Sequence, residues 1–167
     1  MNRSGRTWGE VNAPPIVPAS DRRGGYTVLS AITPEGELFS RVLDTPMESD
    51  QYIEFLRGLL NQYPNVLIVL ADHASFHRSH KVRDFVRAHR QRLRLFFFPR
   101  HAPHLNPDEQ VWNEIKYRQL GRQPIIDKQD LLIRLRSCLD TLQDNTARIL
   151  SFFHLADTRY VLDLNQA

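Results

Sequence analysis

Residues 66–116 of the chain read VLIVLADHASFHRSHKVRDFVRAHRQRLRLFFFPRHAPHLNPDEQVWNEIK. The first six residues, Val66 to Ala71, are all apolar, which is typical of a central strand that is buried on both faces. Asp72 follows this strand directly, and Glu109 lies three residues into a predicted helix. Ligands of open α/β sheets bind beyond the carboxyl ends of the strands. A carboxylate in that place, facing a second carboxylate on a helix, is a common way to hold magnesium for phosphoryl chemistry.

Each acid also has a structural interpretation. Asp72 could start a turn or cap the next helix, which is the commoner use of such an aspartate. We expect the second helix to begin at Asn106-Pro107, because asparagine caps well and proline is tolerated in the first turn. In that case the role of Glu109 could be purely structural, with its side chain bonding back to Asn106 in a capping box.

Helical geometry separates Glu109 from its neighbour Asp108. At about 100° per residue, Glu109, Asn113 and Lys116 fall along one polar stripe of the helix. Asp108 lies over the packing side in the first turn, where its charge favours the helix dipole. We therefore assign Asp108 a structural role and Glu109 the role of metal ligand, with Asp72 as its partner.

Basic residues crowd the segment that follows Asp72. They are Arg78, Lys81, Arg83, Arg87, Arg90, Arg92 and Arg94. Such a cluster attracts phosphate groups by counterion release without reading a base sequence, although a solvated helix face is the alternative. We predict DNA contacts for Arg78, Lys81, Arg83, Arg87 and, on the later helix, Lys116.

The composition is that of an ordinary globular protein. The chain has 167 residues, of which 41% are hydrophobic and 25% charged, with a formal net charge of +3. Its apolar runs are far shorter than the roughly 20 residues that span a bilayer, and we expect no membrane association and a cytoplasmic, nucleoid-associated location. Cys138 is the only cysteine, which excludes a disulfide framework and a cysteine-based zinc site.

The alternation of predicted strands and helices indicates an α/β or mixed layered domain. The expected elements are a hairpin (26–33 and 37–43), strands at 66–71 and 93–98, helices at 48–60, 127–142 and 145–155, a helix after each acid, and a strand-like tail at 160–164. The predicted organisation is an irregular lead-in (1–25), one catalytic domain (26–155) and a C-terminal tail (156–167).

Two motifs carry a family resemblance. They are Leu70-Ala71-Asp72-His73-Ala74-Ser75-Phe76-His77-Arg78-Ser79 and, after Phe98-Pro99, the run His101-Ala102-Pro103-His104-Leu105-Asn106-Pro107-Asp108-Glu109-Gln110-Val111-Trp112. With 36 residues between the two acids (positions 73–108), the chain resembles the catalytic domain of mariner-type DDE transposases, in particular their bacterial insertion-sequence branch. His73 departs from the asparagine usual in that family, and Arg100-His101-Ala102 from Pro-Tyr-Ser.

The resemblance implies an α/β, ribonuclease H-like fold, in which helices flank a mixed sheet, and metal-dependent cutting and joining of DNA at transposon ends. Asp72 and Glu109 would be the second and third acidic residues of the family, and the metal would be Mg²⁺ or Mn²⁺. The implied partners are transposon-end and target DNA.

The first acidic residue of such a family lies on a strand before the hairpin, and no strand pattern precedes Tyr26. Asp21 lacks a strand context, and the prolines of Pro14-Pro15-Ile16-Val17-Pro18 remove ladder donors. We therefore expect a chain without its first strand, from a split or incomplete reading frame and inactive by itself. A homodimer or a partner polypeptide would supply the N-terminal part.

Two other functions fit parts of the pattern. One is a non-catalytic nucleic-acid-binding remnant, in which the basic helix persists without metal chemistry. The other is a histidine-based zinc hydrolase, because His73 and His77 are four residues apart and His80, His101 and His104 lie nearby.

Overall fold

The computed structural model describes residues 16–18, 25–120 and 124–164. Its strands are β1 (Ile16–Pro18), β2 (Gly25–Ile32), β3 (Leu38–Leu43), β4 (Leu67–Ala71) and β5 (Leu93–Phe97). Its α-helices are α1 (Ser49–Gln62), α2 (His80–Ala88), α3 (Glu109–Asn113), α4 (Lys128–Gln143), α5 (Thr146–Phe153) and α6 (Tyr160–Leu164). Short 3₁₀ turns cover Phe76–Arg78 and Pro103–Leu105, and a π-helical segment, Glu114–Gln119, continues α3. In the described parts of the chain, no helix is both long enough and apolar enough to cross a bilayer.

The predicted hairpin is confirmed. Strands β2 and β3 pair antiparallel from Thr27↔Leu43 to Ile32↔Leu38. At the turn, the Gly36 N–H donates to the Thr33 carbonyl (2.9 Å). Gly36 has φ +87, a left-handed conformation that glycine adopts without steric cost.

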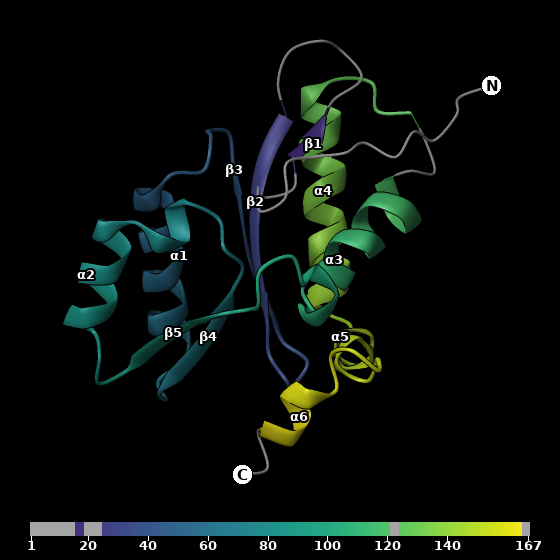
Figure 1. Cartoon of the computed structure of the whole chain (residues 1–167). Helices are drawn as coiled ribbons and strands as arrows, with labels where there is room; N and C mark the ends of the chain where they lie inside the picture. The colour runs from purple at the N-terminus through teal and green to yellow at the C-terminus, as the bar shows by residue number, and fades with distance from the viewer. Residues whose placement is uncertain (1–15, 19–24, 121–123, 165–167) are drawn as a thin grey trace.

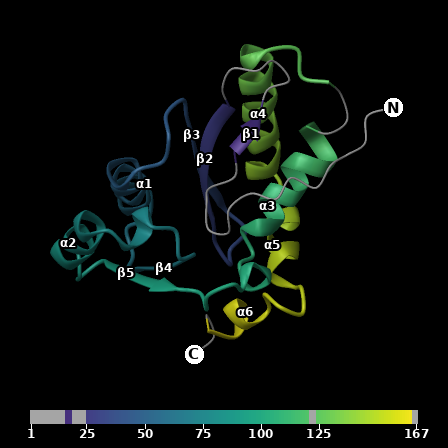
Figure 2. The same ribbon diagram turned by 45° about the horizontal axis from the view of Figure 1, so that its top comes forward.

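The hairpin separates two hydrophobic cores, because successive side chains of a strand point to opposite faces (Figure 1). Tyr26 and Val28 belong to the core formed with α3, α4 and α5. Leu29 belongs to the core formed with α1, α2, β4 and β5. Figure 2 shows the same arrangement in a second view, with the helices of each core on their own side of the hairpin.

Strands β4 and β5 form a parallel pair, in register from Leu67↔Leu93 to Ala71↔Phe97. The prediction that β4 is covered on both faces is wrong. Ile68 is 69% exposed and Phe96, on the same face, 52% exposed. Helices α1 and α2 cover the other face, and within the described residues β4 pairs only with β5. An apolar run therefore marked the strand correctly but not its second cover.

The expected irregular lead-in also needs a correction. Ile16–Pro18 forms β1, which pairs antiparallel with the first residues of β2 in the register Ile16↔Thr27 to Pro18↔Gly25. Proline is tolerated at the end of an edge strand, where its missing N–H is not needed for pairing. In the described residues β1 does not reach β4, so the strands form two separate sheets. The other acidic candidate, Asp21, lies outside the described residues.

The two long C-terminal helices form where they were predicted, and each begins with a side-chain cap. The Asp127 carboxylate accepts the Asp130 N–H at the start of α4 (2.8 Å), and the Asn145 side chain accepts the Arg148 N–H at the start of α5 (3.0 Å). Cys138 is buried in α4, as expected from its apolar stripe. The strand-like tail is instead a helix, α6, which follows the buried Thr158; its hydroxyl donates to the Phe152 carbonyl (2.6 Å).

Candidate metal and DNA site

Asp72 lies just beyond the carboxyl end of β4, where the sequence predicted it. Its Oδ1 accepts the Ala74 N–H (2.9 Å), so the side chain forms the turn that its structural interpretation required. The His77 Nδ1 lies 2.8 Å from the same oxygen. In the described residues both contacts reach Oδ1, which leaves Oδ2 open for another ligand. A structural turn and a binding role are therefore compatible at this residue.

These contacts set the charge of Asp72. Burial would raise its pKa, but the hydrogen bonds from His77 and from the Ala74 N–H outweigh burial, and the pKa lies below its ordinary value. Asp72 is therefore ionised at neutral pH.

His77 is a buried support that the sequence had placed only in the family motif and in the zinc alternative. Its ring lies 4.2 Å from the ring of Tyr52 on α1 and 4.3 Å from that of Phe76. Its Nδ1 faces two acceptors, Asp72 Oδ1 and the Asp72 carbonyl (3.2 Å), so it carries the hydrogen. The five-residue spacing from Asp72 was the signal that could have identified this pair.

His73 ties the ends of the two parallel strands together. Its Nε2 lies 2.6 Å from the Phe98 carbonyl, just after β5, and its ring stacks on Phe97 (5.5 Å). The carbonyl is an acceptor only, so Nε2 donates.

Glu109 is the first residue of α3. The helix begins later than the predicted Asn106-Pro107, because those residues form a turn in which the Asn106 side chain accepts the Asp108 N–H (3.1 Å). The Asn106 N–H bonds to the Pro103 carbonyl (3.0 Å), so it is not part of a capping box with Glu109. Within the described residues no hydrogen bond holds the Glu109 carboxylate.

Glu109 and Asp72 lie within electrostatic reach of each other. Burial raises the pKa of Glu109, Lys116 lowers it and the charge of Asp72 raises it, with a net rise. Two carboxylates that repel each other in this way gain stability from a cation between them. The open Oδ2 of Asp72 and the unbonded Glu109 carboxylate are oxygen donors of the type that Mg²⁺ and Mn²⁺ prefer.

Asp108 is a third carboxylate that sequence reasoning treated only as a helix-dipole partner. Its Oδ2 accepts the hydroxyl of Ser30 on β2 (2.7 Å), while its buried Oδ1 has no partner among the described residues. Burial raises the pKa of Asp108 to about 6, against the Ser30 hydrogen bond, and the charges of Glu109 and Asp72 add to the rise. Nothing in the sequence indicated that Ser30 contacts Asp108, beyond its position in a predicted strand.

The predicted DNA contacts lie on the surface. Arg78, Lys81, Arg83 and Arg87 are exposed on or beside α2, and Lys116 is half-buried in the π-helical segment. Lys81 pairs with Asp50 on α1 (2.7 Å), and Arg87 pairs with Asp84 (3.3 Å). The π geometry interrupts the 100° spacing at Glu114, yet Lys116 still acts on the charge of Glu109.

The described residues do not support a zinc site of histidines. They contain no cluster of three or more histidine, cysteine, aspartate or glutamate residues with metal-binding geometry. Nδ1 of His77 and Nε2 of His73 are both engaged in hydrogen bonds. His101, with φ 58, and His104 lie in the exposed loop before α3.

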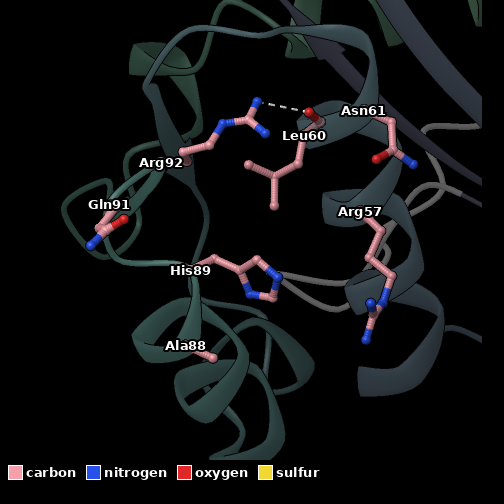
Figure 3. Close-up of a pocket in the computed structure, with 7 residues that line it drawn as sticks. All are labelled: Arg57, Leu60, Asn61, Ala88, His89, Gln91 and Arg92. Carbon is pink, nitrogen blue, oxygen red and sulfur yellow. Dashed lines mark hydrogen bonds between the residues drawn. The ribbon is translucent and has the colours of Figure 1, made fainter.

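A pocket of about 390 Å³ (Figure 3) lies near the amino ends of β4 and β5, away from the carboxyl ends where Asp72 lies. Arg57, His89 and Arg92 line it, together with Leu60 and other residues of the α1 and α2 ends. The Arg92 Nη2 donates to the Leu60 carbonyl (2.9 Å) and to the Tyr63 carbonyl (2.7 Å). Arginine at a helix C-terminus satisfies its last carbonyls and the negative end of its dipole. Arg92 therefore serves the fold, and the candidate site lies at the other ends of the strands.

A sequence family described as DDE superfamily endonuclease matches residues 1–132. No curated protein matches the chain.

Solved structures share the fold at low sequence identity. The Mos1 strand transfer complex matches with a TM-score of 0.65 and 16% identity, over 95% of this chain and 48% of the other. The Mos1 mariner paired-end complex with Mn matches with a TM-score of 0.63 and 17% identity, over 96% of this chain and 50% of the other. The Mos1 mariner catalytic domain matches with a TM-score of 0.56 and 13% identity, over 82% and 78%. The chain thus has the ribonuclease H-like fold of these proteins and spans about half the length of the first two.

Proposed function

Since the chain belongs to the DDE superfamily endonucleases, we propose that it is the catalytic segment of a DNA transposase or integrase-type endonuclease. The observation that carries the proposal is the pairing of an anchored carboxylate, Asp72, with a nearby carboxylate, Glu109, whose pKa is raised by burial and by the charge of Asp72. The chemistry would be hydrolysis of a phosphodiester followed by strand transfer.

Asp72 and Glu109 are the residues that would hold Mg²⁺ or Mn²⁺. When bound, such an ion lowers the pKa of a water or polarises a phosphoryl oxygen. Solved Mos1 catalytic domains include forms with Mn and with Mg. In this chain His77 and the Ala74 N–H hold Asp72 ionised and fixed, and Lys116 favours the ionised form of Glu109. The proposal needs no side chain as nucleophile.

Arg78, Lys81, Arg83, Arg87 and Lys116 are the proposed contacts to DNA phosphates. Exposure of the four residues on or beside α2 supports this role. A cytoplasmic, nucleoid-associated location is part of the proposal, since the chain would act on DNA. Mos1 structures include a strand transfer complex and a paired-end complex, and transposon-end and target DNA are the proposed substrates here.

A second polypeptide or a second copy would complete the site. Two features support this part of the proposal: β4 pairs on one edge only in the described residues, and its outer face exposes Ile68, next to the exposed Val66 that precedes the strand. An open, apolar strand edge is a place where another chain pairs. The proposed catalytic domain comprises residues 26–155, and residues 156–167 form its C-terminal tail.

Manganese binding to the purified chain, followed by electron paramagnetic resonance, tests the metal site. We expect Asp72→Asn and Glu109→Gln each to weaken binding about 100-fold, since even outer-shell changes cost 10- to 100-fold. Asp84→Asn and Glu54→Gln are matched controls, because both residues are exposed and pair only with neighbouring arginines. Equal Mn²⁺ binding by all five proteins would refute the proposal.

The exposed arginines favour a second candidate, a DNA-binding remnant without metal chemistry. Duplex DNA binding that is insensitive to Mn²⁺, together with no Mn²⁺ binding by the parental chain, would support this candidate instead. Metal-dependent plasmid nicking that Asp72→Ala abolishes would exclude it, and would also contradict the prediction that the chain alone is inactive.

A further inference from the structure

The start of α3 is joined to the hairpin by one side-chain hydrogen bond. The Ser30 Oγ on β2 donates to the Asp108 Oδ2 at 2.7 Å, across 78 positions of the sequence. Ser30 lies on the same face of β2 as Tyr26 and Val28, which pack into the core of α3. The bond therefore joins two elements that already share a core.

Asp108 also organises the turn that leads into α3. Its N–H donates to the Asn106 side chain (3.1 Å), and its carbonyl accepts the Val111 N–H (3.0 Å). The α-helical part of α3 has only five residues before the π-helical segment begins. So short a helix does not define its own start, because isolated helices of this length are unstable in water. Contacts outside the helix, of which the Ser30 bond is one, fix its first turn.

Glu109 depends on that first turn for its position. In the described residues its carboxylate has no hydrogen bond, whereas Asp72 has two. The two acids also come from different cores: Ala71, before Asp72, is in the pair with β5, and Val111, after Glu109, packs with α4 and α5. Their separation is therefore set by how α3 sits on β2.

We propose that Ser30 and Asp108 are positioning residues, whose hydrogen bond holds the first turn of α3 on β2 and so fixes Glu109 relative to Asp72. Asp108 acts through its neighbour and does not itself bind the metal. The role of Glu109 as a ligand rests on the proposed function. The position of the turn does not.

Hydrogen exchange on the metal-free chain tests the positioning step. Ser30→Ala removes the donor, and Ser40→Ala is the matched control because Ser40 lies opposite Ser30 in the same ladder. We expect amide exchange in residues 109–111 to accelerate about fivefold in Ser30→Ala, the factor for one lost hydrogen bond. Ser40→Ala should leave it unchanged, and Ser30→Thr, which keeps the hydroxyl, should restore the parental rate.

Manganese binding by the same variants tests the consequence for the site. We expect the half-saturating Mn²⁺ concentration to rise about tenfold in Ser30→Ala and to return in Ser30→Thr. A lower melting temperature with unchanged Mn²⁺ half-saturation would overturn the proposal, because that is the result of a merely structural bond. Equal behaviour of Ser30→Ala and Ser40→Ala in both measurements would overturn it too.

Failure of the proposed function gives a different pattern. The parental chain then binds no Mn²⁺, while exchange of the first turn of α3 still accelerates in Ser30→Ala alone. That pattern supports the tie between β2 and α3 and rejects the metal site that it was proposed to serve.

Discussion

The end of β4 and the start of α3 each present a carboxylate, but they hold it in different ways. Asp72 follows a strand, accepts hydrogen bonds from Ala74 and His77, and has a lowered pKa. Glu109 opens a short helix, has no hydrogen bond within the described residues, and has a raised pKa. One acid is fixed by contacts to itself, and the other by contacts to the residue before it. The comparison teaches that the two acids should tolerate change very differently.

Changing the side-chain length of each acid, aspartate to glutamate and the reverse, should give the largest effect and is the strongest test of this comparison. Asp72→Glu moves the carboxylate away from both hydrogen-bond donors, and we expect Mn²⁺ binding to weaken about 100-fold. Glu109→Asp shortens a side chain that has no bonds to lose, so the loss should stay below about tenfold. Titration followed by electron paramagnetic resonance measures both. Equal losses would show that Asp72 is no better anchored than Glu109.

Removal of the support of Asp72 should have the next largest effect. In His77→Ala the Asp72 pKa rises, because burial is no longer outweighed by this hydrogen bond. We expect about tenfold weaker Mn²⁺ binding and a loss of about 1 kcal/mol in the free energy of unfolding, a modest value because the Asp72 side chain is 38% exposed.

His80→Ala is the control for His77→Ala, since His80 is exposed at the start of α2. Unfolding in urea and Mn²⁺ titration of both variants give the comparison. Parental Mn²⁺ affinity in His77→Ala would remove the reason for treating Asp72 as the anchored acid.

The buried Asp108 predicts a pH dependence of opposite sign to that of Asp72. Its pKa of about 6 in the folded chain exceeds its ordinary value, so the folded state binds the proton more tightly than the unfolded state between about pH 4 and 6. Its contribution to stability is therefore full at low pH and is lost as the pH rises through 6. For Asp72, whose pKa is lowered, the contribution is lost as the pH falls.

Asp108→Asn isolates this contribution, because the amide oxygen still accepts the Ser30 hydroxyl. We expect the variant to be more stable than the parental chain by about 1 kcal/mol at pH 7 and about equally stable near pH 3.5, below the ordinary pKa of an unfolded aspartate. Urea unfolding at both pH values in a chelating buffer measures the difference, with Asp84→Asn as control. A variant that is less stable at pH 7 would contradict the burial of an ionised Asp108.

The basic surface gives the smallest expected effects. Arg83 is exposed and forms no ion pair in the described residues, whereas Lys81 contacts both oxygens of Asp50 (3.0 and 2.7 Å). Arg83→Ala should lower DNA affinity about threefold and flatten the salt slope by about 0.9, while Lys81→Ala should change both less. Fluorescence anisotropy of labelled duplex DNA at several salt concentrations distinguishes them. Asp50→Asn should raise the DNA affinity, because it releases Lys81. An unchanged affinity would contradict the explanation that the ion pair with Asp50 makes Lys81 a weaker DNA contact than Arg83.

Local patterns predicted most of the elements correctly. The Thr33-to-Gly36 turn, the start of the helix at Asp127 and the placement of Asp72 after β4 each depend on a few neighbouring residues. Such signals are complete within one stretch of chain. The resemblance in the two motifs then supplied the fold.

Long-range pairing accounts for what the sequence did not predict. Nothing near Ile68 shows that its face of β4 is uncovered, and nothing near Ser30 shows that it meets Asp108. Strand β1 was missed because the proline rule applies to ladder interiors, whereas β1 is a short edge. Tyr160 to Leu164 alternates like a strand but forms α6.

The hairpin has a consequence for how the chain folds. On β3, Leu38 packs into one core and its neighbour Phe39 into the other. Gly58 on α1 approaches Phe39 so closely that an added Cβ would lie 2.7 Å from the ring. A wall common to both cores prevents either half from folding as an independent unit. Unfolding should therefore be a single cooperative transition, even though Asp72 and Glu109 come from opposite sides of that wall.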